Sequence, residues 1–150
     1  MRDMKITIEF LTPCLVLSKI DRKTNCEYFD RDSHGDIIWN SGWWRSAINK
    51  TVDMFDIESL SSQDFTWALP VKCTTDKHKV KCHGKRHIRY RKHECIPVGV
   101  PVTFEAAVSD TVDEADAEDL FTRVGKYVGM SPYGYKLGYG KFIVLSINIT

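Results

Sequence analysis

The 150-residue chain lacks any long hydrophobic run and has no apolar core near its start. A helix that crosses a bilayer needs about 20 mostly apolar residues, and a secretory signal needs an apolar core behind its basic residues. The five cysteines are odd in number and have no compact spacing, so free thiols in a reducing compartment are expected rather than a disulfide framework. These absences predict a cytoplasmic protein with no membrane partner.

A net charge excess is also missing, because 21 lysines and arginines stand against 20 aspartates and glutamates, for a formal charge of +1. That total argues against a nucleic-acid-binding protein, which usually carries a basic excess. The charges are nevertheless segregated along the chain. Residues 72–92 contain nine basic residues and one acid, whereas residues 110–119 contain six acids and no base. A local charge of +8, against −7 for the remainder, indicates a charged partner.

The hydrophobic pattern predicts a single domain of the α+β class over residues 1–150. Apolar and polar residues alternate at 4–10 and 101–108, as in half-buried strands, and apolar residues recur at helical spacing at 42–55. A second helix is expected to begin at a cap on Ser109 or Asp110 and to stop at Gly129. Further strands are expected at 65–73 and 142–149. This order is that of the ferredoxin-like βαββαβ (RRM-like) fold, with two helices on one face of an antiparallel sheet.

Two segments do not fit this core pattern. Residues 18–36 are polar and have no clear period, so they are interpreted as a functional or mobile loop. Residues 72–95 alternate basic and other side chains around His83-Gly84, which predicts a β-ribbon inserted between the second and third strands. Such a ribbon suits the phosphate backbone of RNA, and a solvated charged hairpin is the alternative explanation. Its candidate RNA-binding residues are Lys77, Lys79, Lys81, Lys85, Arg86, Arg89, Tyr90, Arg91 and Lys92.

Glycine and tyrosine concentrate just before the last expected strand, where residues 125–140 hold five of the nine glycines and four of the six tyrosines. Glycines allow a backbone with positive φ to approach a ligand, successive amides can form an anion-binding nest, and tyrosine rings can stack on bases. The alternative is a helix that ends at glycine, followed by a tight turn with core tyrosines. The candidate RNA-binding residues of this segment are Tyr133, Gly134, Tyr135, Lys136, Gly138, Gly140 and Lys141.

Two segments carry a resemblance to a known family. The sequence VGKYVGMSPYGYKLGYGKF at 124–142 resembles the Gly-rich loop and final strand of the RAMP superfamily. These repeat-associated RNA-binding proteins form the backbone, cap and processing subunits of CRISPR effector complexes. The sequence GDIIWNSGWWRSAI at 35–48 is similar to the family's apolar strand and helix start, with Asn-Ser-Gly in place of the usual Pro-Gly-Ser. The chain would be a minimal, single-domain member.

The resemblance implies that the helix start and the Gly-rich loop contact RNA phosphates, which brings Ser41, Trp43, Arg45 and residues 134–141 to one groove. The helical register predicts that Trp44 lies in the core and leaves Trp43 as the candidate for base stacking. The ribbon corresponds to the projecting thumb of backbone subunits. The expected partners are therefore single-stranded, guide-like RNA and other RAMP-type subunits or copies of itself. Between copies, the acidic residues 110–119 would meet the ribbon of the next subunit.

Two other functions compete with an RNA-binding subunit of a CRISPR-like ribonucleoprotein. Processing members of the superfamily cleave RNA without metal, so the first is an endoribonuclease with His34 as general base. An acidic residue of the same loop, Asp21, Asp30 or Asp32, would serve in a related cleavage. A loop histidine without a role is the plainer explanation of His34. The second is a viral or mobile-element protein that uses the fold to interact with or inhibit an effector complex. We prefer a binding module to an enzyme and expect no cofactor.

The basic segment also contains possible metal ligands, because Cys73, Cys82 and Cys95 accompany four histidines there: His78, His83, His87 and His93. Zinc ligands usually come in pairs two to four residues apart, and these cysteines are spaced more widely. No metal is therefore predicted, and a structural zinc at the root of the ribbon is the alternative.

Overall fold

The computed structural model describes residues 1–15, 19–21, 23–24, 26–68, 70–83, 88–130 and 138–150, with the backbone alone at 19–21, 80–83 and 88–90. The elements are β1 (Arg2–Phe10), β2 (Cys14–Leu15), β3 (Lys19–Asp21), β4 (Cys26–Tyr28), β5 (Ile37–Ile38), α1 (Ser41–Phe55), the 3-10 helix η1 (Ser62–Asp64), β6 (Phe65–Trp67), β7 (Pro70–Val71), β8 (Asp76–His83), β9 (Ile88–Ile96), β10 (Pro101–Val108), α2 (Glu114–Arg123), the π-helix η2 (Val124–Val128) and β11 (Phe142–Ile149).

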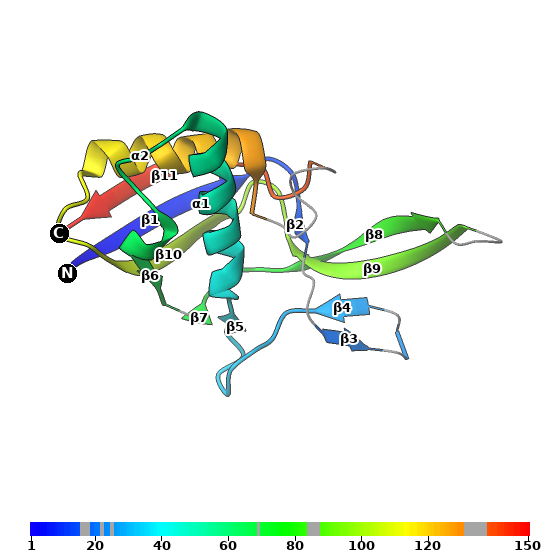
Figure 1. Cartoon of the computed structure of the whole chain (residues 1–150). Helices are drawn as coiled ribbons and strands as arrows, with labels where there is room; N and C mark the ends of the chain where they lie inside the picture. The colour runs from blue at the N-terminus through cyan, green and yellow to red at the C-terminus, as the bar shows by residue number, and fades with distance from the viewer. Residues whose placement is uncertain (16–18, 22, 25, 69, 84–87, 131–137) are drawn as a thin grey trace.

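An antiparallel sheet of four strands, in the order β11-β1-β10-β6, forms the body of the molecule. Both α-helices pack on one face of this sheet (Figure 1). The alternating pattern of the sequence explains the arrangement, because Met4, Ile6 and Ile8 of β1 point to the helices and are buried, whereas Lys5 is exposed. The predicted α+β class, with an antiparallel sheet and two helices, is confirmed, and the strand order is compatible with a ferredoxin-like unit.

Aromatic side chains form the centre of the core. Trp44 of α1 is completely buried, and its ring stacks on Trp67 of β6 with the centroids 4.3 Å apart. Phe104 and Phe121 meet Trp44 edge-on at 5.2 and 5.5 Å. Edge-to-face and stacked pairs add about 0.5–1.5 kcal/mol each beyond the area that they bury. The prediction that Trp44 belongs to the core is therefore confirmed.

Helix α1 begins one residue earlier than the apolar pattern suggested, because Asn40 caps it. The side-chain oxygen of Asn40 accepts a hydrogen bond of 2.8 Å from the amide of Gly42. The helix ends at Asp56, which has a left-handed backbone with φ of 52°. Ser41 is thus the first residue of α1, with Arg45 one turn further along.

The predicted start of the second helix was wrong by several residues. The helix begins at Glu114 with Asp113 as its N-cap, and Ser109 instead belongs to a turn in which it accepts from the amide of Val112 at 3.1 Å. The guanidinium of Arg2 also donates to the carbonyls of Ser109 and Val112 and holds that turn in place. The predicted stop at Gly129 is confirmed, since this residue has a φ of 84° after the π-helical turn η2.

Two further expectations need correction. The strand expected at 65–73 is divided into β6 and β7, and β7 pairs with β5 in a separate two-stranded sheet. The polar residues 18–36, interpreted as a loop, contain the hairpin β3–β4, whose second strand pairs in parallel with β9. The expected ribbon is formed by β8 and β9 and projects away from the body (Figure 1). Of the helices in the described residues, none is long and apolar enough to cross a membrane.

Candidate nucleic-acid interface

The ribbon places lysines from both of its strands on one face. In the register of β8 and β9, Lys79 lies directly opposite Lys92, and both are exposed. Lys77, two residues before Lys79 on the same face, lies with its ammonium group 5.6 Å from the ring centroid of Tyr28. Among the residues that the structure describes, no carboxylate forms an ion pair with any of the three lysines. We call Lys77, Lys79 and Lys92 the lysine face.

Like charges directly opposite each other on an antiparallel pair destabilise it. Lys79 and Lys92 form such a pair, and no carboxylate of the described residues offsets their charge, so solvent or an anion would relieve their repulsion. The lysine face is therefore the part of the described ribbon whose charge is best explained by an anionic partner. Lys81, Arg89 and Tyr90 continue the two strands, with Lys81 opposite Tyr90 in the register. Lys85 and Arg86 lie outside the described residues.

Arg91 was predicted to bind RNA, but it is already paired within the protein. Its guanidinium lies 3.1 Å from the carboxylate of Glu27 on β4, and that carboxylate is almost wholly buried. The same carboxylate lies 3.6 Å from Nδ1 of His93, which is also buried. Arg91 therefore fastens the hairpin β3–β4 to the ribbon.

A second buried carboxylate, that of Glu94, organises the root of the ribbon. It accepts hydrogen bonds of 2.8 Å from the amide of Phe29 and from the hydroxyl of Thr75, and it pairs with the guanidinium of Arg31. Neither Glu27 nor Glu94 was identified from the sequence. The available signal was a glutamate directly beside the basic run, since a carboxylate among many cations favours an ion pair.

The returning end of the Gly-rich segment contacts the ribbon. The hydroxyl of Tyr139 lies 3.4 Å from Nε2 of His78, and the two rings meet edge-on at 5.5 Å. Two features that the sequence predicted separately are thus adjacent in space. The four candidates Tyr133, Gly134, Tyr135 and Lys136 lie outside the described residues.

The amides of Gly140 and Lys141 are already used inside the protein. They donate to the carbonyl of Pro13 and to the hydroxyl of Thr12, both at 2.9 Å. Gly138 and Gly140 have φ of 78° and 75°, a conformation that favours glycine, so their identity is explained by the turn. Partial burial lowers the pKa of Lys141. The anion-binding nest expected from these glycines therefore does not include the amides of Gly140 and Lys141.

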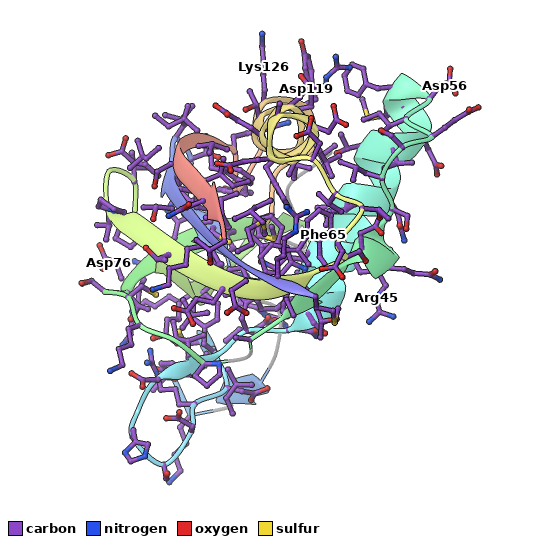
Figure 2. The ribbon with its side chains drawn as sticks, turned by 90° about the vertical axis from the view of Figure 1, so that its left-hand side faces the viewer. Arg45, Asp56, Phe65, Asp76, Asp119 and Lys126 are labelled. Atoms are coloured by element: carbon purple, nitrogen blue, oxygen red, sulfur yellow. The ribbon has the colours of Figure 1, made fainter. Side chains whose placement is uncertain are left out.

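The start of α1 forms a separate groove. Ser41 and Arg45 line a cavity of about 370 Å³ with residues of η1 and β6. Trp43 is half-buried, since its ring meets that of Trp39 edge-on at 4.9 Å. Figure 2 shows Arg45 and Asp76, the first residue of the ribbon, on opposite sides of the molecule. The structure thus separates the helix start from the root of the ribbon.

The loop that carries the candidate catalytic residues is built around Asp32. Its carboxylate accepts hydrogen bonds of 2.9 Å from the amides of both His34 and Asp36, which stabilises a tight turn. The imidazole of His34 is exposed and forms no hydrogen bond with any residue that the structure describes. A general base needs a partner that positions it, and none of the described residues supplies one.

The candidate zinc ligands whose side chains the structure describes are not gathered into a site near the root of the ribbon; the side chains of Cys82 and His83 are not among them. Burial raises the pKa of both Cys73 and Cys95 to about 11, which disfavours the thiolate that a metal requires. Across the described part of the chain, no three His, Cys, Asp or Glu side chains are placed to hold a metal ion. His87 lies outside this part.

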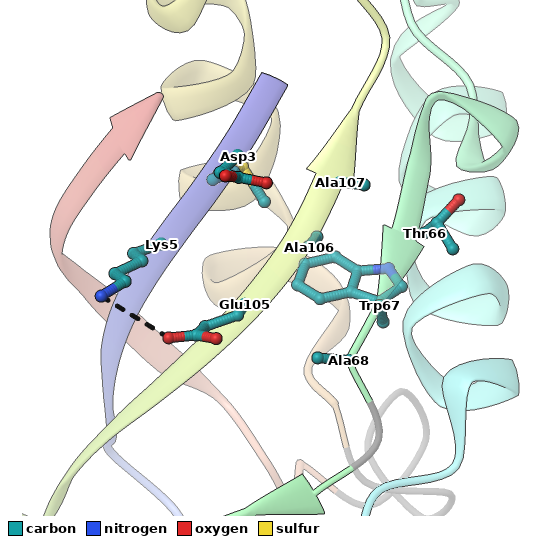
Figure 3. A pocket seen from close by; sticks show the side chains of 9 residues that line it. Asp3, Lys5, Thr66, Trp67, Ala68, Glu105, Ala106 and Ala107 are labelled. Carbon is teal, nitrogen blue, oxygen red and sulfur yellow. Dashed lines mark ion pairs between the residues drawn. The ribbon is translucent and has the colours of Figure 1, made fainter. Parts of the chain in front are cut away.

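A groove of about 560 Å³ lies along β6, β10 and β1 (Figure 3). Its charged side chains are Asp3, Lys5 and Glu105, and the ammonium group of Lys5 lies 3.6 Å from the carboxylate of Glu105. The single positive charge is therefore paired and one carboxylate remains in excess. This balance repels phosphate, so the sheet groove is a poorer RNA site than the lysine face.

Comparisons with known proteins identify a similar fold. No protein-family model matches the chain, and no curated protein matches it significantly. Its structure is similar to a chain in "Cryo-EM structure of the Type III-B Cmr-beta bound to cognate target RNA", with a TM-score of 0.63 and 13% sequence identity. The match covers 99% of this chain and 60% of that chain, so the protein matches only part of its neighbour's length. At this identity the likeness shows a shared fold.

Proposed function

We propose that the protein is an RNA-binding, RAMP-type subunit of a CRISPR-like ribonucleoprotein complex, built on a ferredoxin-like domain. The observation that carries the proposal is the lysine face, where Lys79 and Lys92 oppose each other without an acidic partner among the described residues. The similarity to a chain of the Type III-B Cmr-beta structure bound to target RNA supports the same assignment.

Single-stranded, guide-like RNA is the ligand that suits this surface. Alternate residues of a strand lie about 7 Å apart, so Lys77 and Lys79 offer two successive cationic contacts to an extended phosphate backbone. The ring of Tyr28 beside Lys77 supplies an aromatic surface of the kind on which bases stack. In this proposal Arg91 acts by positioning the hairpin β3–β4, and Tyr28 joins the candidate contacts.

The test is the salt dependence of binding to a fluorescently labelled single-stranded RNA, measured by anisotropy. Each single-strand phosphate contact contributes about 0.7 to the slope of log K against log salt, so Lys79→Gln with Lys92→Gln should lower the slope by about 1.4. The matched control, Lys5→Gln with Lys126→Gln, removes the same charge from exposed sites off the ribbon. A slope that falls equally in both double variants, or in neither, would refute binding at the lysine face.

The same samples distinguish binding from cleavage. If the protein only binds, the labelled RNA stays intact on a denaturing gel after prolonged incubation with the native chain. Cleavage that disappears in His34→Ala would instead favour the endoribonuclease, with Asp32→Asn as a second probe of that loop. Clean protein with no RNA affinity at low salt would favour the third class, a protein that uses the fold to interact with an effector complex.

A further inference from the structure

A groove of about 420 Å³ lies between the end of α1 and the exposed side of α2, away from the ribbon. Its floor is apolar and contains Phe55, Ile57, Leu60 and Leu120. Its rim carries four carboxylates, those of Asp56, Glu58, Asp116 and Asp119. Figure 2 shows Asp56 just beyond the end of α1 and Asp119 on α2, both well separated from Asp76 at the start of the ribbon.

The groove already accommodates one guanidinium group, that of Arg123. Its central carbon lies 4.7 Å from the ring centroid of Phe55, and its Nε lies 3.2 Å from the carboxylate of Asp119. Tyr127 also packs against Phe55, with the ring centroids 5.1 Å apart, and 41% of Tyr127 is exposed. The surface therefore combines an exposed aromatic patch with carboxylates, and one arginine leaves an excess of three negative charges on the rim.

We propose that this groove docks an arginine-bearing segment of a protein partner. Arginine side chains suit both parts of the groove, because their methylene stems cover apolar surface while the guanidinium pairs with carboxylates and stacks on aromatic rings. The excess of negative charge repels the phosphates of RNA, so a nucleic acid is not the ligand that this surface favours. The proposal concerns a surface separate from the lysine face and does not depend on RNA binding.

The probe is a fluorescein-labelled peptide of 12 residues with alternating leucine and arginine, titrated with the full chain and followed by anisotropy. Asp56→Asn with Asp116→Asn removes two rim charges and leaves the pair of Arg123 and Asp119 intact. Asparagine also tolerates the left-handed backbone of residue 56. Two exposed ion pairs account for about a 2- to 30-fold change in affinity, so the Kd should rise within that range.

The control, Glu114→Gln with Glu118→Gln, neutralises two exposed carboxylates of the same helix that do not line the groove. It raises the net charge by the same two units as the groove variant and should change the Kd less than twofold. A peptide with glutamate in place of arginine should not bind. Equal weakening in the two double variants, unchanged binding in the groove variant, or no binding of the arginine peptide to the native chain would each overturn the proposal. Unaltered RNA affinity in the groove variant separates this result from a failure of the lysine face.

Discussion

Substitution of Glu94 by glutamine tests whether buried electrostatics hold the ribbon on the body. The side chain of Glu94 is 8% exposed and serves three donors: the amide of Phe29, the hydroxyl of Thr75 and the guanidinium of Arg31. The Phe29 amide donates to one carboxylate oxygen, whereas Thr75 and Arg31 share the other. Glutamine has no charge and turns an NH2 group toward one of these two sides, so the ion pair with Arg31 and at least one hydrogen bond are lost.

The size of the expected loss in unfolding free energy depends on how exposed the partners of Glu94 are to water. Breaking a fully buried ion pair costs about 3–5 kcal/mol, and hydrogen bonds to charged groups contribute about 1.5–3 kcal/mol. Because the Arg31 side chain is 36% exposed, solvent compensates part of its lost partner. We therefore expect Glu94→Gln to lower the free energy of unfolding by about 2–3 kcal/mol.

Urea unfolding followed by tryptophan fluorescence measures this change, with Thr75→Val as the control. That variant removes one donor to the carboxylate from a part-buried position and leaves the charges in place, so its expected loss is about 1.5 kcal/mol, the lower end for a hydrogen bond to a charged group. A loss below about 1 kcal/mol for Glu94→Gln, or one no larger than that of Thr75→Val, would refute the reasoning. RNA affinity at a urea concentration where both variants are folded should change little, because the lysine face is intact.

Three further predictions follow from single features. Lys79→Gln with Lys92→Gln removes a like-charge pair, so it should raise the free energy of unfolding in urea by about 0.2–1 kcal/mol, although it weakens RNA binding. A lower free energy of unfolding would contradict this. Gly125→Ala should cost about 1–3 kcal/mol in thermal unfolding, because a Cβ there would overlap the carbonyl oxygen of Phe142. An unchanged melting temperature would contradict the close packing of η2 on β11. Burial raises the pKa of Cys73 and Cys95 from 9.0 to about 11, so their labelling by a disulfide reagent should be slow at pH 8 and should accelerate up to about pH 11. The contribution of these two neutral thiols to stability is complete below pH 9 and is lost as the pH rises toward 11. Labelling at pH 8 at the rate of an exposed thiol would contradict the raised pKa of these cysteines.

The parts of the fold that follow from local patterns were predictable. The alternation at 4–10 specifies which face of β1 is buried, and the helical spacing around Trp44 specifies the face of α1 that meets the sheet. The pairing of β8 with β9 was also predictable, because the sequence alternates basic and other residues on both sides of His83-Gly84, as in a β-hairpin; the connection at 84–87 lies outside the described residues.

The anchoring of the ribbon was not predictable, since it depends on contacts between distant residues. Glu94 and Phe29 are 65 residues apart in sequence, and Arg91 and Glu27 are 64 apart. In the sequence, Glu27 and Arg31 belong to a polar segment whose apolar residues follow neither the helix nor the strand period, which is typical of a loop. Their charges are tolerated inside the fold because each finds a partner from a different segment. The shifted start of α2 has the same cause, because Arg2 holds the preceding turn from the other end of the chain.

The candidate site was predicted in composition more accurately than in detail. The sequence grouped the basic residues of the ribbon as candidate RNA contacts, which stays a prediction. Among those whose side chains the structure describes, Lys77, Lys79 and Lys92 are exposed, whereas Arg91 is held by Glu27. The glycines before β11 were correctly recognised as conformationally special. A positive φ, however, explains a glycine equally well whether its amide faces a ligand or an internal carbonyl, and for Gly140 the acceptor is Pro13.

The near-zero total charge conceals two surfaces of opposite sign. An RNA that neutralises the lysine face would leave the groove between α1 and α2 with its excess of carboxylates. Repulsion from that groove would keep the RNA on the ribbon side, because exposed charges interact over about 8–10 Å at physiological ionic strength. The same repulsion would exclude a second RNA strand from the groove and leave it open to a basic protein segment. If both proposals hold, the separation of charge would let one small domain bind two different ligands at once, and a variant at either surface should affect only one of them.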